Sequence, residues 1–112
     1  MLKAGEVCEN PVTGERAVIR IGTDETGGEL LVVDLYLRPG AAVMGEHLHP
    51  SMEERFTMLR GQVGFRISGQ ESVAELGVKL IVSPGTPHDW WNVGPEEAVV
   101  RLKCDQPPAL KP

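Results

Sequence analysis

The sequence is poor in histidine, aromatic residues and cysteine, and it contains no long apolar run. Phe, Trp and Tyr make up 4% of the 112 residues, and there are three histidines and two cysteines. No stretch approaches the ~20 apolar residues of a membrane-spanning helix, so we expect no membrane partner. The two cysteines, Cys8 and Cys104, form no CxxC pair, and this excludes a disulfide-rich scaffold.

Positive charge is also in short supply. The chain carries 11 Lys and Arg against 16 Asp and Glu, for a net charge of -5. Because the cations occur singly along the sequence, no basic stripe would neutralise phosphates, and we expect no nucleic-acid partner. The first residues show no signal-peptide pattern, which predicts a cytoplasmic protein with free thiols. A Cys8–Cys104 bridge is conceivable if the chain ends meet, but reducing conditions disfavour it.

Several motifs of common enzyme classes are missing as well. There is no GxSxG, no glycine-rich phosphate loop and no Cys-His pairing, so acyl transfer and nucleotide chemistry are not supported. Glycine and proline, by contrast, are frequent, with 13 and 9 copies. They separate short extended runs over residues 16–21, 29–37, 52–59, 62–67, 71–75, 78–82, 88–92 and 98–104. This pattern predicts one all-β domain, either a barrel or a sandwich.

The segment 52–59 is the one place where a helix competes with a strand. Met52, Phe56 and Leu59 fall at helical spacing, whereas Glu54, Phe56 and Met58 alternate as on a strand. The segment is short for a helix between Pro50 and Gly61, so we predict a strand that carries Glu54, Phe56 and Met58 on one face.

The histidines are placed in a way that suggests metal binding. His47 and His49 project from the same face of an extended strand, and Glu54 follows beyond a Pro50 break. If the fold brings His88 to them, three imidazoles and one carboxylate could hold a divalent transition metal: Fe, Mn, Ni, Co, Cu or Zn. The alternative is that each histidine is an ordinary core or surface residue.

The spacing of these residues resembles that of a known family. Gly40, His47, His49, Glu54 and Gly61 resemble the first motif of the cupin superfamily, and Gly77, Gly85, His88 and Asn92 resemble the second. The departures are small: six residues separate Gly40 from His47, and Ser83 stands where proline is frequent. Neither departure involves a ligand. The resemblance implies a small jelly-roll β-barrel, also called a double-stranded β-helix, with His47, His49, Glu54 and His88 as metal ligands.

The same resemblance implies the domain limits and the activity. We expect a core over about residues 29–104, preceded by a strand and loop region over 1–28 and followed by a Pro-rich tail over 105–112. Cupin dioxygenases use this ligand set, so a dioxygenase-like oxidoreductase acting on a small oxygen-rich organic substrate is favoured. Cupin decarboxylases and isomerases share the set and stay as alternatives. Small members of the family are commonly homodimers, and we expect a homodimer here.

Strand parity suggests which side chains surround the metal. Trp90, Phe56 and Met58 are predicted to form an apolar substrate pocket, with Phe65 a weaker candidate and Trp91 directed away, towards a subunit interface. No histidine is left to act as an independent general base. A base would have to be Glu46, Glu53 or Tyr36, and parity directs both glutamates away from the site. A non-catalytic barrel that binds a small molecule or a metal is therefore the competing hypothesis.

Overall fold

The structure is a computed structural model that describes residues 3–10, 15–22, 27, 30–47 and 53–105, with only the backbone for residues 8–10 and 43–47. All of its regular elements are β-strands. They are β1 (Val7–Asn10), β2 (Glu15–Ile21), β3 (Leu30–Leu37), β4 (Ala42–His47), β5 (Glu53–Arg60), β6 (Val63–Ile67), β7 (Gln70–Ala74), β8 (Lys79–Val82), β9 (His88–Asn92) and β10 (Ala98–Asp105). The described part of the chain contains no helix that could span a membrane.

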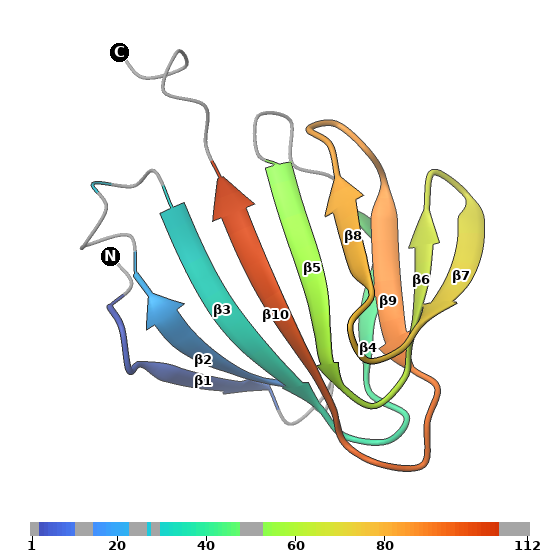
Figure 1. Ribbon diagram of the computed structural model, residues 1–112, viewed down its shortest axis with the longest axis horizontal. Helices are drawn as coiled ribbons and strands as arrows, with labels where there is room; N and C mark the ends of the chain where they lie inside the picture. The colour runs from blue at the N-terminus through green and yellow to red at the C-terminus, as the bar shows by residue number, and fades with distance from the viewer. Residues whose placement is uncertain (1–2, 11–14, 23–26, 28–29, 48–52, 106–112) are drawn as a thin grey trace.

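The strands form two antiparallel sheets that face each other, as Figure 1 shows. One sheet has six strands in the order β1-β2-β3-β10-β5-β8, and the other has four in the order β4-β9-β6-β7. This is the architecture of a jelly roll, so the all-β jelly-roll prediction is confirmed. Consecutive strands often lie in different sheets, and this crossing places β5 opposite β9.

The core fills the space between the inner faces of the two sheets. Alternate residues of each strand point inward, as the two-residue period of a strand requires. Phe56 and Met58 of the large sheet and Phe65 and Trp90 of the small sheet are at most 4% exposed. The Phe56 ring meets the Phe65 ring edge-on at a centroid distance of 5.2 Å and the Trp90 ring at 5.0 Å. Three of the chain's five Phe, Trp and Tyr residues thus lie where the sheets meet.

Two Pro-Gly turns set the positions of β4 and β9. Gly40 and Gly85 both have a φ of 78°, the left-handed conformation that glycine adopts without strain. The first turn is closed by the Ala41 amide donating to the Arg38 carbonyl at 2.9 Å. The second is closed by the Thr86 amide donating to the Ser83 carbonyl at 3.2 Å. Each strand starts soon after its turn, and the two strands pair with each other.

Most strand predictions are confirmed, including the strand rather than helix over β5. The hairpin between β6 and β7 turns at Ser68 and Gly69, which both have positive φ. Strand β1, which was not predicted from the sequence, pairs with β2 at the edge of the large sheet. Four residues are too few to show a period, so pairing with β2 and not local pattern defines this strand.

Candidate metal centre

Glu54 and His88 come from facing sheets and meet in the interior. The Glu54 side chain is 3% exposed and the His88 side chain 1% exposed. His88 Nε2 lies 3.0 Å from Glu54 Oε1. These residues are 34 positions apart in the printed sequence, so only the packing of β5 against β9 brings them together. Two of the four predicted ligands are therefore in direct contact.

The turn before β9 fixes the orientation of the His88 ring. His88 Nδ1 lies 2.9 Å from the carbonyl oxygen of Thr86, the residue that ends the Pro84–Gly85 turn. A carbonyl only accepts hydrogen bonds, so Nδ1 must carry the proton and donate. In the neutral ring, Nε2 then presents its lone pair to the Glu54 carboxylate. Two acceptor atoms at this distance need a cation between or beside them, either a proton or a metal ion.

The pKa of His88 shows how this environment treats a proton. Burial by itself lowers the pKa, since it disfavours the imidazolium. The hydrogen bonds to Glu54 and Thr86 and the negative charges of Glu54 and Asp89 outweigh burial and raise the pKa above its ordinary value. The site therefore favours positive charge next to Glu54.

The structure places the other two predicted ligands less fully. The backbone of His47 ends β4, and its Cα is paired with that of His88 across the sheet. The side chain of His47 is not described, and His49 lies outside the described residues. Among the described side chains, no group of three or more His, Cys, Asp or Glu is positioned to hold a metal ion.

Two of the predicted pocket residues, Trp90 and Phe56, pack against His88 on the inner faces. The His88 and Trp90 rings are stacked, with centroids 5.7 Å apart and an angle of 11° between the planes. Phe56 meets the His88 ring edge-on at a centroid distance of 6.1 Å. Met58 and Phe65 are also buried and belong to the same core cluster. The surroundings of the imidazole are thus aromatic and apolar, and contacts of this kind hold the ring in place.

Cys104 lies beside the site on β10. Its Cα is paired with that of Glu54, and its free thiol is buried. Burial, with smaller contributions from the charges of Glu54 and Asp105, raises the pKa of the thiol to about 12. The thiol is therefore neutral at physiological pH and behaves as a small apolar side chain.

Asn92, the last residue of the second motif, has a structural role. It is 5% exposed, and its side-chain nitrogen donates to the carbonyls of Leu37 at 3.0 Å and Glu96 at 2.8 Å. Its side-chain oxygen accepts from the Gly94 amide at 2.8 Å. The residue thus ties the end of β9 to the end of β3 and to the turn before β10.

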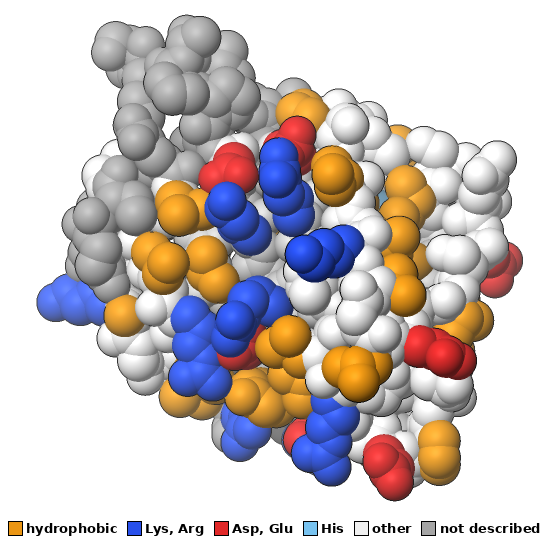
Figure 2. Space-filling view, in the orientation of Figure 1, with side chains coloured by type: hydrophobic (Ala, Val, Ile, Leu, Met, Phe, Trp, Pro, Cys, Tyr) orange, Lys and Arg blue, Asp and Glu red, His pale blue; other side chains and the backbone are white. Residues whose placement is uncertain are grey.

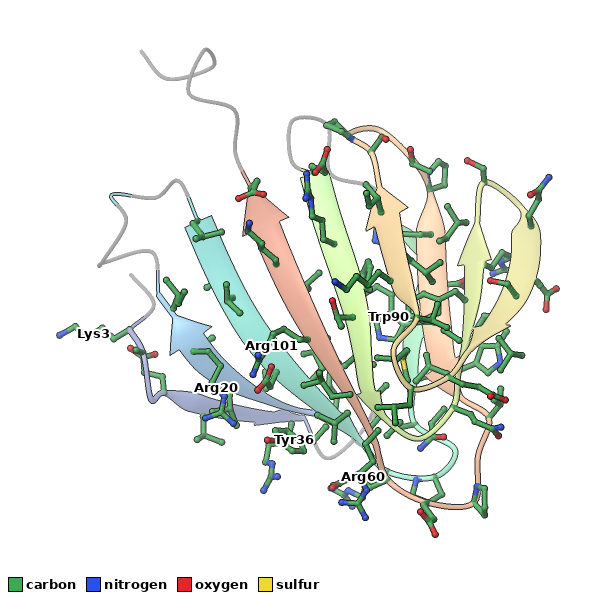
Figure 3. The ribbon with its side chains drawn as sticks, in the orientation of Figure 1. Lys3, Arg20, Tyr36, Arg60, Trp90 and Arg101 are labelled. Atoms are coloured by element: carbon green, nitrogen blue, oxygen red, sulfur yellow. The ribbon has the colours of Figure 1, made fainter. Side chains whose placement is uncertain are left out.

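The outer face of the large sheet holds a buried carboxylate that was not predicted from the sequence. Asp34 is 2% exposed. Arg101 donates to it through Nε at 2.7 Å and through an Nη at 3.0 Å, and Arg20 donates through Nε at 2.8 Å. Burial alone raises the pKa of Asp34, but the hydrogen bonds and charges of the two arginines outweigh it and hold the pKa below its usual value. Figure 3 shows Arg20 and Arg101 close together on this face.

Comparison with known proteins identifies related sequences and folds. A family model described as "Cupin domain" matches residues 33–102, which span β3 to β10. No curated protein matches the sequence.

Solved structures match over most of the chain. A predicted oxalate decarboxylase from Thermotoga maritima has a TM-score of 0.81 and 19% identity, with 94% of each chain covered. The cupin domain of Cnp3 from Schizosaccharomyces pombe has a TM-score of 0.78 and 11% identity, covering 91% of this chain and 69% of that one. KdgF from Halomonas sp. has a TM-score of 0.74 and 16% identity, covering 95% and 91%. At these identities the matches show a shared fold.

Proposed function

Because the chain belongs to the cupin domain family, we propose that it binds one divalent transition metal per chain through His47, His49, Glu54 and His88. The contact between Glu54 Oε1 and His88 Nε2, at 3.0 Å, is the observation that carries the proposal. Both atoms are acceptors when the imidazole is neutral, and both are withdrawn from solvent. A cation that bound both of them would satisfy the pair without a proton, and carboxylate and imidazole together suit a transition metal.

The fold also supplies what a metal ligand needs around it. The Thr86 carbonyl accepts a hydrogen bond from Nδ1–H of His88. This bond leaves Nε2 available for the metal and raises the basicity of Nε2. Trp90 and Phe56 pack against the imidazole and restrict its rotation. These contacts fix the orientation of the imidazole without the help of a metal ion.

We further propose that the protein is an enzyme for a small oxygen-rich organic substrate, with dioxygenase-like oxidoreductase chemistry favoured. A metal bound by three imidazoles and one carboxylate would acidify and orient an anionic oxygen ligand. The chain would contribute an apolar pocket: Trp90, Phe56 and Met58 would exclude water and contact the substrate. Decarboxylation and isomerisation remain alternatives, and the match to a predicted oxalate decarboxylase makes oxalate a reasonable test substrate.

A non-catalytic binding protein is the second candidate. The chain has three histidines, and the proposal uses all of them as ligands. Two of the groups that could replace a histidine base lie on the outer face: the Tyr36 hydroxyl accepts from Arg20 at 3.1 Å, and Glu53 is paired with Arg55 at 2.7 Å. With both occupied there, the chain has few groups left to move a proton at the metal.

Elemental analysis of protein purified without added metal or chelator tests metal binding. The proposal predicts a near-stoichiometric transition metal in the wild type and loss of tight binding in His88→Ala, with the barrel still folded by circular dichroism. Unchanged metal content in His88→Ala would contradict the ligand assignment. A wild-type protein that refuses metal on reconstitution would mean that the motif serves only the packing of the barrel.

Activity assays distinguish the two candidate functions, an enzyme and a non-catalytic binding protein. Oxygen uptake by the Fe(II)-loaded protein is measured against a panel of diketones, catechols and flavonols, and CO₂ release from oxalate is measured with the Mn(II)-loaded protein. Oxygen uptake with one of the panel supports the dioxygenase, and CO₂ release supports the decarboxylase. No turnover of any substrate, combined with tight metal binding, favours the binding protein.

The expected homodimer and cytoplasmic location are also proposals. Light scattering coupled to gel filtration measures the mass in solution, and fractionation of the source cells measures the location. A dimer contact through the outer face of β3 is unfavourable, because Asp34 and its two arginines make this face charged.

A further inference from the structure

We propose that the outer face of the large sheet carries a second binding site, separate from the metal centre, which takes a small organic anion with at least two negative charges. The site is a hollow of about 290 Å³ over β10, β5 and β8. It lies on the opposite side of the sheet from the side chains of Glu54 and His88. Neither the metal nor the proposed reaction is needed for it.

The hollow results from one short side chain surrounded by long cationic ones. Thr57 of β5 is paired with Arg101 of β10 on one side and with Lys79 of β8 on the other. Arg55 lies two residues earlier on the same strand and face, and Lys103 is paired with Arg55. Neighbouring strands are ~5 Å apart and alternate residues of a strand ~7 Å apart, so four cationic side chains surround the threonine at short range.

The rest of the lining is apolar. Val32 and Ile81 also line the hollow, together with parts of Phe56 and Leu80. Val32 is paired with Lys103, and Ile81 is paired with Arg55, so the two apolar side chains lie at opposite ends of this row of residues. No Asp or Glu is among the described residues that line it. An apolar body bearing two negative charges fits a hollow of this size and lining.

The register of the strands gathers cations that the sequence keeps apart. At least six of the chain's 11 Lys and Arg residues occupy outward positions of this sheet: Arg16, Arg20, Arg55, Lys79, Arg101 and Lys103. In Figure 2 the Lys and Arg side chains lie together over the middle of this face. The cations occur singly along the sequence, but the fold brings them together on this face. A chain with a net charge of -5 thus has one basic face.

Three carboxylates on this face hold the cations in place without neutralising them all. Asp34 binds Arg101, Glu53 binds Arg55 at 2.7 Å, and Asp105 lies 3.8 Å from Lys103. Arg55 and Arg101 are 51% and 47% exposed, and each uses only some of its five N–H donors in these contacts. Lys79 makes no ion pair with any residue that the structure describes. Cationic side chains that are held in place and still have unused N–H donors can bind an anion.

The charge distribution favours a small anion over larger partners. In a two-fold dimer through this face, each basic surface would meet its own copy, and like charges would repel. Nucleic acid would need an uninterrupted basic track, whereas Asp34, Glu53 and Asp105 interrupt this one. A compact ligand avoids all three carboxylates, because none of them lines the hollow.

Calorimetric titration of the purified protein with phenyl phosphate and with phthalate tests the proposal. Both probes place two negative charges on an aromatic ring, so they separate phosphate from dicarboxylate recognition. Either probe binding supports the site and identifies the acidic group, and both binding supports recognition of charge alone. Affinity should fall as salt is added. It should stay within about twofold after metal removal with EDTA, which separates this site from the metal centre.

Variants on the same face locate the binding. Lys79→Gln and Arg55→Gln should each weaken binding roughly fourfold, the effect of one charge ~5 Å away in water. Thr57→Leu, which fills the hollow at unchanged charge, should weaken binding at least about tenfold. Arg16→Gln is the matched control, because Arg16 lies over the Tyr36 ring outside the hollow, and it should change affinity less than about twofold.

Three results would overturn the proposal. The first is no binding of either probe at millimolar concentration by folded wild-type protein. The second is an equal loss of affinity in Arg16→Gln and Lys79→Gln, which would indicate attraction by the whole face. The third is binding of an oligonucleotide but of neither small anion, which would assign the face to a macromolecule.

Discussion

The two faces of the large sheet each bury one carboxylate, and the two carboxylates have different kinds of partner. Glu54 on the inner face is 3% exposed and meets an imidazole, whose charge depends on a proton. Asp34 on the outer face is also 3% exposed, measured on the side chain, and meets two guanidinium groups that are always charged. Two equally buried carboxylates therefore differ in their partners: the charge opposite Asp34 is permanent, whereas the charge opposite Glu54 depends on protonation.

The difference lies in how each negative charge is compensated. Asp34 is compensated permanently within the fold, and burying it stabilises the sheet by linking β2, β3 and β10. Glu54 is compensated only when a proton or another cation is present. A buried acid with a conditional partner is a feature of functional sites, whereas one with permanent partners is a feature of structure. A substitution on one face of the sheet therefore tests one of the two carboxylates and leaves the other in place.

The largest effect is expected from Phe56, whose side chain lies on the inner face between Glu54 and Met58. It is 1% exposed and contacts the rings of Phe65, Trp90 and His88. Phe56→Ala should lower the free energy of unfolding by about 4 kcal/mol through loss of apolar contacts and a residual cavity. Urea denaturation measures the change. Arg55→Ala, one residue away on the outer face, should have a much smaller effect because its ion pair is exposed.

The second effect concerns Glu54 as a metal ligand. Glu54→Gln keeps the size of the side chain and removes its charge, and we expect metal affinity to fall at least about 100-fold, measured by competition with a chelator. Glu53→Gln is the control, because Glu53 faces outward and pairs with Arg55. Equal affinity of Glu54→Gln and wild type would show that the inner carboxylate is structural, like Asp34.

The sequence predicted the inner face better than the outer one. Gly and Pro turns and the two-residue alternation were enough for the strands and for the inward positions of Glu54, Phe56 and Met58. These features depend on local pattern and turn chemistry, which a single sequence records. That Glu54 and His88 belong together was implied by the resemblance of the motif residues to the cupin superfamily and not by local pattern.

The outer cluster could not be predicted in this way. Asp34 and Arg101 are 67 residues apart, and their contact depends on the register of β10 against β3. The extended run over residues 29–37 is largely apolar on both faces, which is the pattern of a strand buried on two sides. Its outer side is indeed covered at Asp34, but by two arginine side chains and not by another layer of apolar residues. Long side chains that cover a neighbour leave no period in the sequence.

Removing the charge of Asp34 should have an effect that depends on pH. Asp34→Asn should lower the free energy of unfolding by about 2 kcal/mol near neutral pH, less than for a fully buried ion pair because both arginines are half-exposed. The folded pKa of Asp34 is lowered, so its stabilisation is present above the unfolded pKa of about 3.9 and is lost as pH falls through the folded value.

Denaturation of wild type and Asp34→Asn across this range checks the prediction. The difference between the two proteins should be constant from neutral pH down to about pH 5 and should shrink in stronger acid. Taking the difference cancels the other carboxylates that titrate there. A difference independent of pH would mean that the variant loses packing and hydrogen bonds but not charge.

The smallest effect separates the two arginines that hold Asp34. Arg101 donates two hydrogen bonds to the carboxylate, whereas Arg20 donates one and uses another donor on the Tyr36 hydroxyl at 3.1 Å. Arg101→Gln should therefore cost more, about 1 kcal/mol once solvent screening of the half-exposed side chain is included. Arg20→Gln should cost less.

Combining each change with Asp34→Asn measures its coupling to the carboxylate, because a double-mutant cycle removes effects that do not involve the pair. The coupling should be larger for Arg101 than for Arg20, and should disappear for both in acid as Asp34 is protonated. Equal couplings would mean that the number of hydrogen bonds does not decide the effect and that the two charges act alike. The outer carboxylate would then be held by the positive charge of the two arginines and not by the two hydrogen bonds that Arg101 donates. The same positive charge would attract an anion to this face.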